Sequence, residues 1–196
     1  MGNNFASTPT FSVQAWIKTD PGDTSPMTPV SKHWAGWGNG YYLSVNSVND
    51  GFTYPTLAGF RSLDNVTLSP TATGQPPVND GVWHQLVGVY NNGTSSLYVD
   101  GNFVASTYPN GYSNSSVSFL IGGLGDYSDG TPVNVFHGFI DEVGIYNNAL
   151  SGDEVKALYD STLNPVAPIP EPATMLLFGI GLAGLVGIVI RRKPKK

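Results

Sequence analysis

One stretch, Trp83 to Ser106, constrains the fold more than any other part of the sequence. It reads WHQLVGVYNNGTSSLYVDGNFVAS, in which apolar and polar residues alternate in short runs. The runs are separated by Asn91-Asn92-Gly93 and by Asp100-Gly101. An Asp-Gly pair favours the tight turn between antiparallel strands, because both residues tolerate positive φ. The stretch therefore predicts two consecutive antiparallel hairpins.

Composition agrees with a fold of many short strands. The 196 residues are enough for one domain with a tail, and they include 24 Gly and 15 Pro with only 12% charged residues. Long exposed helices would require more Lys, Glu and Ala. The sequence contains no Cys, which excludes disulfides, thiolate metal sites and a cysteine nucleophile.

Upstream of the hairpins, the sequence predicts one clear strand and several weaker ones. In FSVQAWIKTD every second residue is apolar, which predicts a strand with one apolar face formed by Phe11, Val13, Ala15 and Ile17. Residues 19–40 are rich in Pro, Gly, Ser and Thr, and they predict a long loop that carries aromatic residues. A strand pattern follows at residues 41–45, residues 51–54 and 57–61 are weaker strand candidates, and residues 67–79 indicate a Pro-punctuated loop.

Downstream, the sequence predicts two more strands and one short helix. Residues 116–122 alternate again, and the segment HGFIDEVGIY at residues 137–146 predicts a strand in which Asp141 shares a face with apolar residues. Ser151 is then followed three residues later by Glu154, the spacing of a capping box at a helix start. The apolar stripe of this helix consists of Val155, Leu158 and Tyr159.

Three segments in order, FSVQAWIKTD, the double hairpin and FHGFIDEVGIYNNALSGDEVKALYD, resemble the LamG-like jelly-roll domains of the concanavalin A-like lectin/glucanase superfamily. The resemblance covers roughly residues 5–162. It implies an all-β, two-sheet antiparallel jelly-roll sandwich that closes with a strand and one short C-terminal helix. It also implies a core position for Trp83 and a structural role for His84. Such domains usually have one or two strands ahead of the first segment, so we expect the N-terminal strands of the domain at residues 1–163 to be missing.

The C-terminal part of the sequence predicts a membrane segment. Residues 164–172 form a Pro-rich linker, and residues 173–190 are eighteen residues without charge. A helix of that length spans about 27 Å, enough for a thin bilayer core. Residues 191–196 form a basic tail, which predicts that the tail stays cytoplasmic and that the globular body lies outside. We therefore expect a single transmembrane helix after the jelly roll.

This C-terminal part also resembles the PEP-CTERM sorting signal of Gram-negative bacteria. The resemblance rests on the order of a Pro-Glu-Pro motif, an apolar helix and a basic cluster, with the motif residues Pro170, Glu171, Pro172, Arg191, Arg192 and Lys193. It implies an exosortase as processing partner and an inner-membrane precursor whose mature body reaches the cell surface or the medium. It also implies an association with exopolysaccharide production.

Charge and motif content exclude several classes of function. Residues 1–170 hold four basic and thirteen acidic residues, a formal charge of −9, which argues against nucleic-acid binding. No Gly-x-Ser-x-Gly or His-Glu-x-x-His motif is present. Glycosidases on such folds need two carboxylates on one face of a strand, whereas the adjacent Asp141 and Glu142 are predicted to point to opposite faces. We therefore expect a protein that is not an enzyme.

Candidate binding residues lie in the predicted loops. Aromatic side chains can stack on sugar rings, and the candidates are Trp34, Trp37, Tyr41 and Tyr112. The alternative is that these rings pack under their own loop. For calcium, the best local pair of carboxylates is Asp126 and Asp129, with Asp20 and Asp23 as a second pair. Asp and Gly also dominate ordinary turns, so the alternative is that these residues form turns without binding a metal.

Two classes of function remain. The first is an exported surface or matrix protein whose jelly roll binds polysaccharide or a partner protein without catalysis. The second is a structural envelope protein anchored by its C-terminal helix, and a glycan-active hydrolase is a third, weaker alternative.

Overall fold

A computed structural model describes residues 10–34, 37–46, 48–49, 52–53, 56–62, 67–68, 75–107, 115–125 and 131–163. The chain divides into two compact units, residues 1–160 and 161–196. Of the second unit, only the last residues of one helix are described, so the linker, the predicted transmembrane helix and the basic tail lie outside the described residues.

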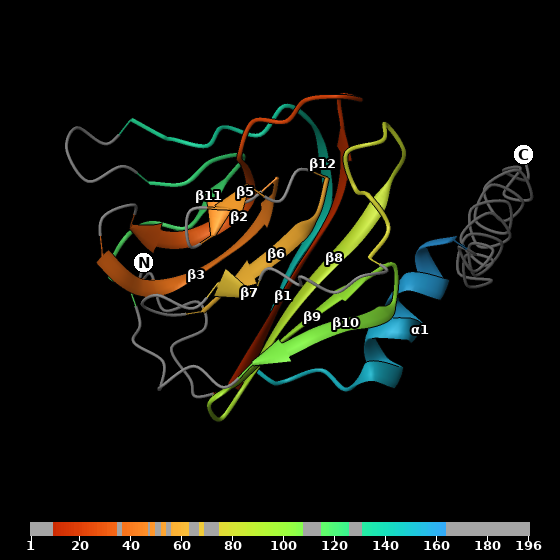
Figure 1. The fold of residues 1–196 in the computed structure, drawn as a ribbon. Coiled ribbons are helices and arrows are strands. Elements are labelled where there is room, and N and C mark those ends of the chain that lie inside the picture. Colours follow the sequence, from red (N-terminus) through yellow and green to blue (C-terminus); the bar gives the residue numbers. More distant parts are fainter. Residues whose placement is uncertain are drawn as a thin grey trace, which may run out of the picture. The chain divides into compact units, whose positions relative to one another are not determined.

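The first unit is an antiparallel β-sandwich (Figure 1). Sheet A has the strand order β10-β9-β8-β1-β12, and sheet B has the order β11-β2-β3-β6-β7. The strands of sheet A are β1 (Thr10–Thr19), β8 (His84–Asn91), β9 (Thr94–Val99), β10 (Asn102–Thr107) and β12 (Gly138–Tyr146). Those of sheet B are β2 (Met27–Trp34), β3 (Trp37–Val45), β6 (Ala58–Arg61), β7 (Thr67–Leu68) and β11 (Leu120–Ile121). A separate small hairpin pairs β4 (Val48–Asn49) with β5 (Phe52–Thr53), so the all-β prediction is confirmed.

The two consecutive hairpins are present as predicted, and they supply three of the five strands of sheet A. β8 pairs with β9 and β9 with β10, both antiparallel. At the first turn Asn92 and Gly93 have φ of 45° and 99°, and at the second Asp100 and Gly101 have φ of 52° and 73°. Two successive positive φ values are the signature of the turn that matches the twist of paired strands. The turn residues therefore fix the register of three consecutive strands.

The core lies between the two sheets and follows the predicted alternation of β1. Phe11, Val13, Ala15 and Ile17 are all fully buried and face sheet B. Across the core, Phe60 of β6 packs directly on the backbone of Gly88 in β8, where an added Cβ would lie 2.2 Å from the Phe60 Cδ2. The absence of a side chain at Gly88 therefore allows the two sheets to approach closely at this point.

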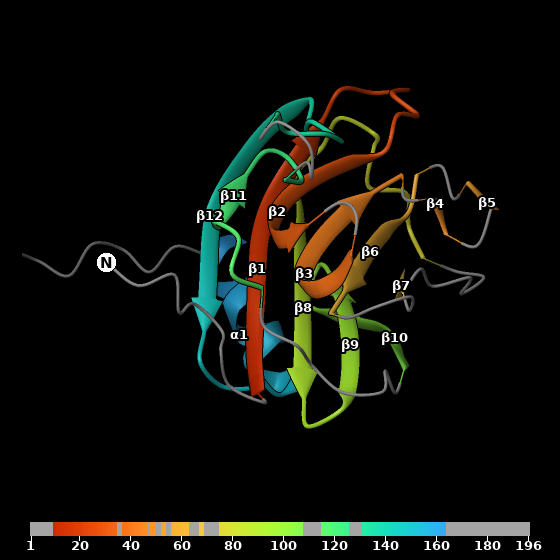
Figure 2. The ribbon, with the colours of Figure 1, turned by 90° about the vertical axis from the view of Figure 1, so that its left-hand side faces the viewer.

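The outer face of sheet A is covered in part by helix α1 (Gly152–Leu163), which lies on the side away from sheet B (Figure 2). The capping box is confirmed, because the Ser151 backbone N–H donates to the Glu154 carboxylate at 2.7 Å and the Glu154 N–H donates to the Ser151 hydroxyl at 3.3 Å. Val155 is fully buried, and the Tyr159 ring stacks on Trp16 of β1 with centroids 5.5 Å apart and 7° between planes. Trp16 therefore belongs to the contact between helix and sheet.

The long loop predicted at residues 19–40 is wrong. Only residues 20–26 separate β1 from β2, while residues 27–34 form β2 and residues 37–40 belong to β3. The short strand β7 also lies within the predicted loop at residues 67–79, whereas in the predicted strand at residues 116–122 only β11 is paired. Residues 19–40 are rich in loop-forming residues, but pairing with neighbouring strands overrides this local composition over β2 and β3.

The predicted face of Asp141 is also wrong, because β12 contains a β-bulge. The pairing of β1 with β12 shifts between Gln14 and Trp16, and Glu142 has a φ of 47°. An extra residue reverses the alternation of a strand on one side of the bulge. Val143 and Ile145 therefore pack against the core, whereas Asp141 is exposed and accepts a hydrogen bond from the Glu142 N–H at 2.8 Å.

Candidate functional site

Two exposed aromatic side chains lie together on the outer face of sheet A. Trp83 is 42% exposed and Phe139 is 64% exposed, although both residue types usually bury most of their surface. Their ring centroids are 6.5 Å apart and their planes are inclined by 51°. We call this pair the aromatic platform. Large apolar groups that stay exposed on a rigid sheet are typical of a binding surface.

The pairing of three adjacent strands brings the platform together. Phe139 pairs with Lys18 across β12 and β1, and Trp83 directly precedes His84, which pairs with Ile17 across β8 and β1. Lys18 therefore lies between the two aromatic residues in the order of the strands. In the described part of the chain, Lys18 makes no ion pair and is partly exposed.

Polar groups flank the platform. The pair of Asp141 with Trp16 lies two positions from the pair of Phe139 with Lys18, so the two pairs share a face and the exposed Asp141 lies on the outer face near the platform. The site thus combines two apolar ring faces with a cationic donor and an anionic acceptor. Such a combination can contact both the apolar faces and the hydroxyl groups of a sugar.

The exposure of Trp83 corrects the core position implied by the resemblance. Trp83 ends the segment before β8, and the inward positions of that strand begin with the buried His84 and continue at Leu86, Gly88 and Tyr90. The parity of the strand therefore turns Trp83 away from sheet B. The sequence signal was present, since Leu86 lies three positions after Trp83 and an odd offset places two residues of a strand on opposite faces.

The aromatic residues expected from the sequence are placed differently. Trp34 and Trp37 pair across the end of the β2–β3 hairpin, but only their backbone is described, and Tyr112 lies outside the described residues. Tyr41 is fully buried, with its ring 4.8 Å from that of Phe11. A sugar cannot reach a ring in this position, so Tyr41 is a core residue and not a binding residue.

The neighbour of Tyr41 faces the other way. Tyr42 is partly exposed on the outer face of sheet B, with the His33 ring edge-on at 5.1 Å and the Arg61 guanidinium 6.0 Å from its centroid. Burial lowers the pKa of His33 to about 4, and the charge of Arg61 acts in the same direction, so this imidazole is neutral at physiological pH.

The calcium prediction for Asp126 and Asp129 concerns residues outside the described part of the chain. Of the second pair, Asp23 already accepts hydrogen bonds from the His137 Nδ1 at 2.6 Å and the Ser25 N–H at 2.7 Å. These bonds, that of His137 first, lower the pKa of Asp23 to about 2. Within the described residues, no group of three or more His, Asp or Glu side chains could hold a metal ion.

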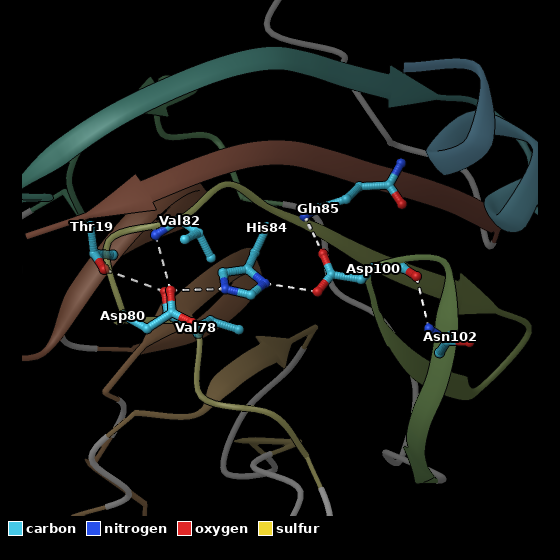
Figure 3. Close-up of polar contacts among 8 residues, drawn as sticks. All are labelled: Thr19, Val78, Asp80, Val82, His84, Gln85, Asp100 and Asn102. Carbon is cyan, nitrogen blue, oxygen red and sulfur yellow. Dashed lines mark hydrogen bonds and ion pairs between the residues drawn. The ribbon is translucent and has the colours of Figure 1, made fainter. Parts of the chain in front are cut away.

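The most elaborate polar cluster surrounds His84 (Figure 3). The imidazole Nδ1 lies 2.7 Å from the Asp100 carboxylate and Nε2 lies 3.1 Å from the Asp80 carboxylate. Burial, the largest single influence, opposes the charged form, but the hydrogen bonds and charges of Asp100 and Asp80 together raise the pKa of His84. Because both ring nitrogens are engaged, His84 has no free nitrogen to act as a general base.

The sorting residues predicted from the sequence, Pro170, Glu171, Pro172, Arg191, Arg192 and Lys193, lie outside the described residues. Among the helices that the structure describes, none has the length and apolarity needed to cross a membrane.

Comparisons with solved structures agree with the sandwich fold. Domain 4 of AbnA, a GH43 extracellular arabinanase from Geobacillus stearothermophilus in complex with arabinotriose, is 24% identical with a TM-score of 0.55, over 78% of this chain and 68% of that chain. A protein from Bacteroides ovatus that has been proposed to bind carbohydrate is 20% identical with a TM-score of 0.59, over 78% of this chain and 42% of that chain. The binding domain of botulinum neurotoxin serotype D is 14% identical with a TM-score of 0.55, over 84% of this chain and 40% of that chain.

Comparisons of sequence give the family. No curated protein matches the chain in sequence. The family profile of the concanavalin A-like lectin/glucanases superfamily matches residues 2–156, and the profile of the PEP-CTERM protein-sorting motif matches residues 168–193. Since the first match covers most of the chain and agrees with the jelly-roll sandwich, the protein belongs to the concanavalin A-like lectin/glucanase superfamily and ends in a PEP-CTERM sorting motif.

Proposed function

We propose that the protein is an exported, non-catalytic polysaccharide-binding module whose aromatic platform stacks on the sugar rings of its ligand. The observation that carries this proposal is the pair of exposed rings of Trp83 and Phe139 on a rigid sheet. The likeness to an arabinanase domain solved with arabinotriose and to a protein proposed to bind carbohydrate also supports carbohydrate binding.

The chemistry of the platform favours a neutral polysaccharide. The ring faces of Trp83 and Phe139 can cover the apolar faces of two sugar units, while Lys18 donates to hydroxyl groups and Asp141 accepts from them. The formal charge of −9 over residues 1–170 would repel a strongly anionic chain, most of all at low ionic strength.

The sorting motif supports export. An exosortase would recognise Pro170, Glu171 and Pro172 and remove the apolar segment at residues 173–190 together with the basic cluster. Proline keeps the backbone of the linker out of a helix, which leaves the motif accessible to an enzyme at the membrane surface. The mature module would then lie at the cell surface or in the medium.

Calorimetric titration of the full-length protein in detergent tests the binding proposal. The ligands are oligosaccharides of a neutral glucan, an arabinan and an acidic uronan. We expect binding to a neutral ligand, and Trp83→Ala and Phe139→Ala should each weaken it about tenfold. Phe103→Ala is the matched control, because Phe103 is 58% exposed on β10 and lies outside the platform.

Two outcomes would overturn the proposal. Absence of binding to every glycan would favour the structural envelope protein, and platform variants that bind as tightly as the wild type would show that the ligand binds elsewhere. Expression with and without an exosortase tests the export route by intact mass. The proposal requires loss of the tail near Pro170 to Pro172 only when the enzyme is present.

A further inference from the structure

Trp83 does not belong to a regular strand. It is the last residue before β8, so no ladder of backbone hydrogen bonds fixes its position in the way that β12 fixes Phe139. A ring that stacks on a ligand must nevertheless be held in place, because each rotor that is frozen on binding costs affinity. We infer that Asp80, His84 and Asp100 form a clamp that holds the Trp83 ring in the platform, which makes His84 a positioning residue for sugar binding; this inference rests on the proposed function.

Figure 3 shows the hydrogen bonds of the clamp, which hold the backbone at Val82 and Gln85, before and after Trp83 in the sequence. On one side, the Asp80 carboxylate accepts from the Val82 N–H at 3.0 Å. On the other, the Asp100 carboxylate accepts from the Gln85 N–H at 2.9 Å, and the Asp100 N–H donates back to the Gln85 carbonyl at 2.9 Å. His84 connects the two carboxylates across its ring. The backbone is thus fixed one residue before Trp83 and two residues after it.

The far end of the clamp is itself anchored. Asp100 belongs to the turn between β9 and β10. There the side-chain amide of Asn102 donates a hydrogen bond to the backbone carbonyl of Asp100 at 2.8 Å. Helix α1 packs so closely on this turn that a Cβ at Gly101 would lie 3.0 Å from Lys156 and from Tyr159. The clamp therefore connects the segment before β8 with the β9–β10 turn, on which helix α1 packs.

The clamp depends on a charged imidazole. A neutral ring has one N–H and can donate to only one of the two carboxylates, whereas the imidazolium donates to both. The charged groups that act on it are Asp80 on its own segment and Asp100 on the β9–β10 turn. Lys156 and the neutral Tyr159 of α1 pack on Gly101 of the same turn, and Lys18 follows Ile17, the residue of β1 that pairs with His84. Loss of the proton at alkaline pH should release one carboxylate and loosen Trp83.

The test measures both affinity and the mobility of Trp83 in the full-length protein. Acrylamide quenching assigned to Trp83, from the difference between wild type and Trp83→Phe, should increase in His84→Gln. In the same variant the affinity for the glycan should fall about tenfold. The wild-type affinity should decrease as pH rises through the titration of His84, and that of His84→Gln should not change with pH.

Asp80→Asn is a second variant in case His84→Gln does not fold. The Asp80 side chain is at the exposed end of the clamp, so this substitution should disturb the fold less. It retains the acceptor for the Val82 N–H but removes a charge that raises the pKa of His84, so it should give a smaller loss of affinity and move the pH dependence of the affinity to lower pH. Unchanged affinity and quenching in both variants would show that the cluster only stabilises the fold. If Trp83→Ala itself has no effect on affinity, the proposed function fails, while the quenching of Trp83 still tests the clamp.

Discussion

The contact between Gly88 and Phe60 gives a sharp test of how the two sheets pack. In Gly88→Ala the new Cβ would lie 2.2 Å from the Phe60 Cδ2, whereas carbon atoms in contact prefer about 3.5 Å or more. The ring must therefore move by about 1.3 Å, but Phe60 is fully buried beside Phe11, with ring centroids 6.4 Å apart. Overpacking of this kind costs about 1–3 kcal/mol. For a domain of this size that predicts a decrease in Tm of about 2–12 °C.

Thermal unfolding followed by near-UV circular dichroism measures the effect. Phe60→Leu in the Gly88→Ala background should recover part of the loss, since a smaller side chain removes the overlap, and the double-mutant cycle should show a coupling of about 1 kcal/mol. Gly152→Ala is the control, because the nearest atom would be Tyr98 at 3.7 Å and alanine favours a helix. A Gly88→Ala protein that melts with the wild type, or a double mutant without coupling, would refute this description of the core.

Three further predictions concern the clamp, the helix cap and a buried amide. The raised pKa of His84 means that its stabilisation is complete below the ordinary value of 6.5 and is lost as pH rises through the raised native pKa, so the Tm difference between wild type and His84→Gln should narrow at alkaline pH. Ser151→Ala should cost about 1 kcal/mol in chemical denaturation and speed amide exchange in the first turn of α1. Asn46 is fully buried with a φ of 55°, donates to the Asp23 and Ser25 carbonyls and accepts from the Thr56 N–H. Asn46→Ala should therefore lower the free energy of unfolding by about 3 kcal/mol, and a loss under 1 kcal/mol would contradict this network.

The parts of the fold that the sequence predicts are those in which local and tertiary preferences agree. The double hairpin, the alternation of β1 and the capping box each depend on residues close in the chain, and each is confirmed. The β2–β3 hairpin was missed because its segment is rich in loop-forming residues, and its strands are held by sheet pairing with β6 and β11. The contact of Trp16 with helix α1 could not be predicted either, because its partner Tyr159 lies far away in the sequence.

The candidate site could be predicted only in part. The alternation of β3 places Tyr41, Leu43 and Val45 on one face and Tyr42 on the other, so the burial of Tyr41 was readable from the sequence. The aromatic platform was not readable from the sequence. The bulge at Glu142 reverses the alternation of β12, and this reversal places Phe139 on the face opposite to Val143 and Ile145. The resemblance to a family of lectin-like domains predicted the structural role of His84 but not the neighbouring exposed Trp83.

The bulge at Glu142 has a consequence for association between copies of the protein. In the described part of the chain β12 pairs only with β1, so its other side is a sheet edge to which another extended chain could add. A positive φ at Glu142 interrupts the straight row of donors and acceptors along that edge, and the exposed carboxylates of Asp141 and Glu142 repel a second copy of the same strand. The distortion that exposes Phe139 thus also protects this sheet edge against edge-to-edge association between copies of the protein.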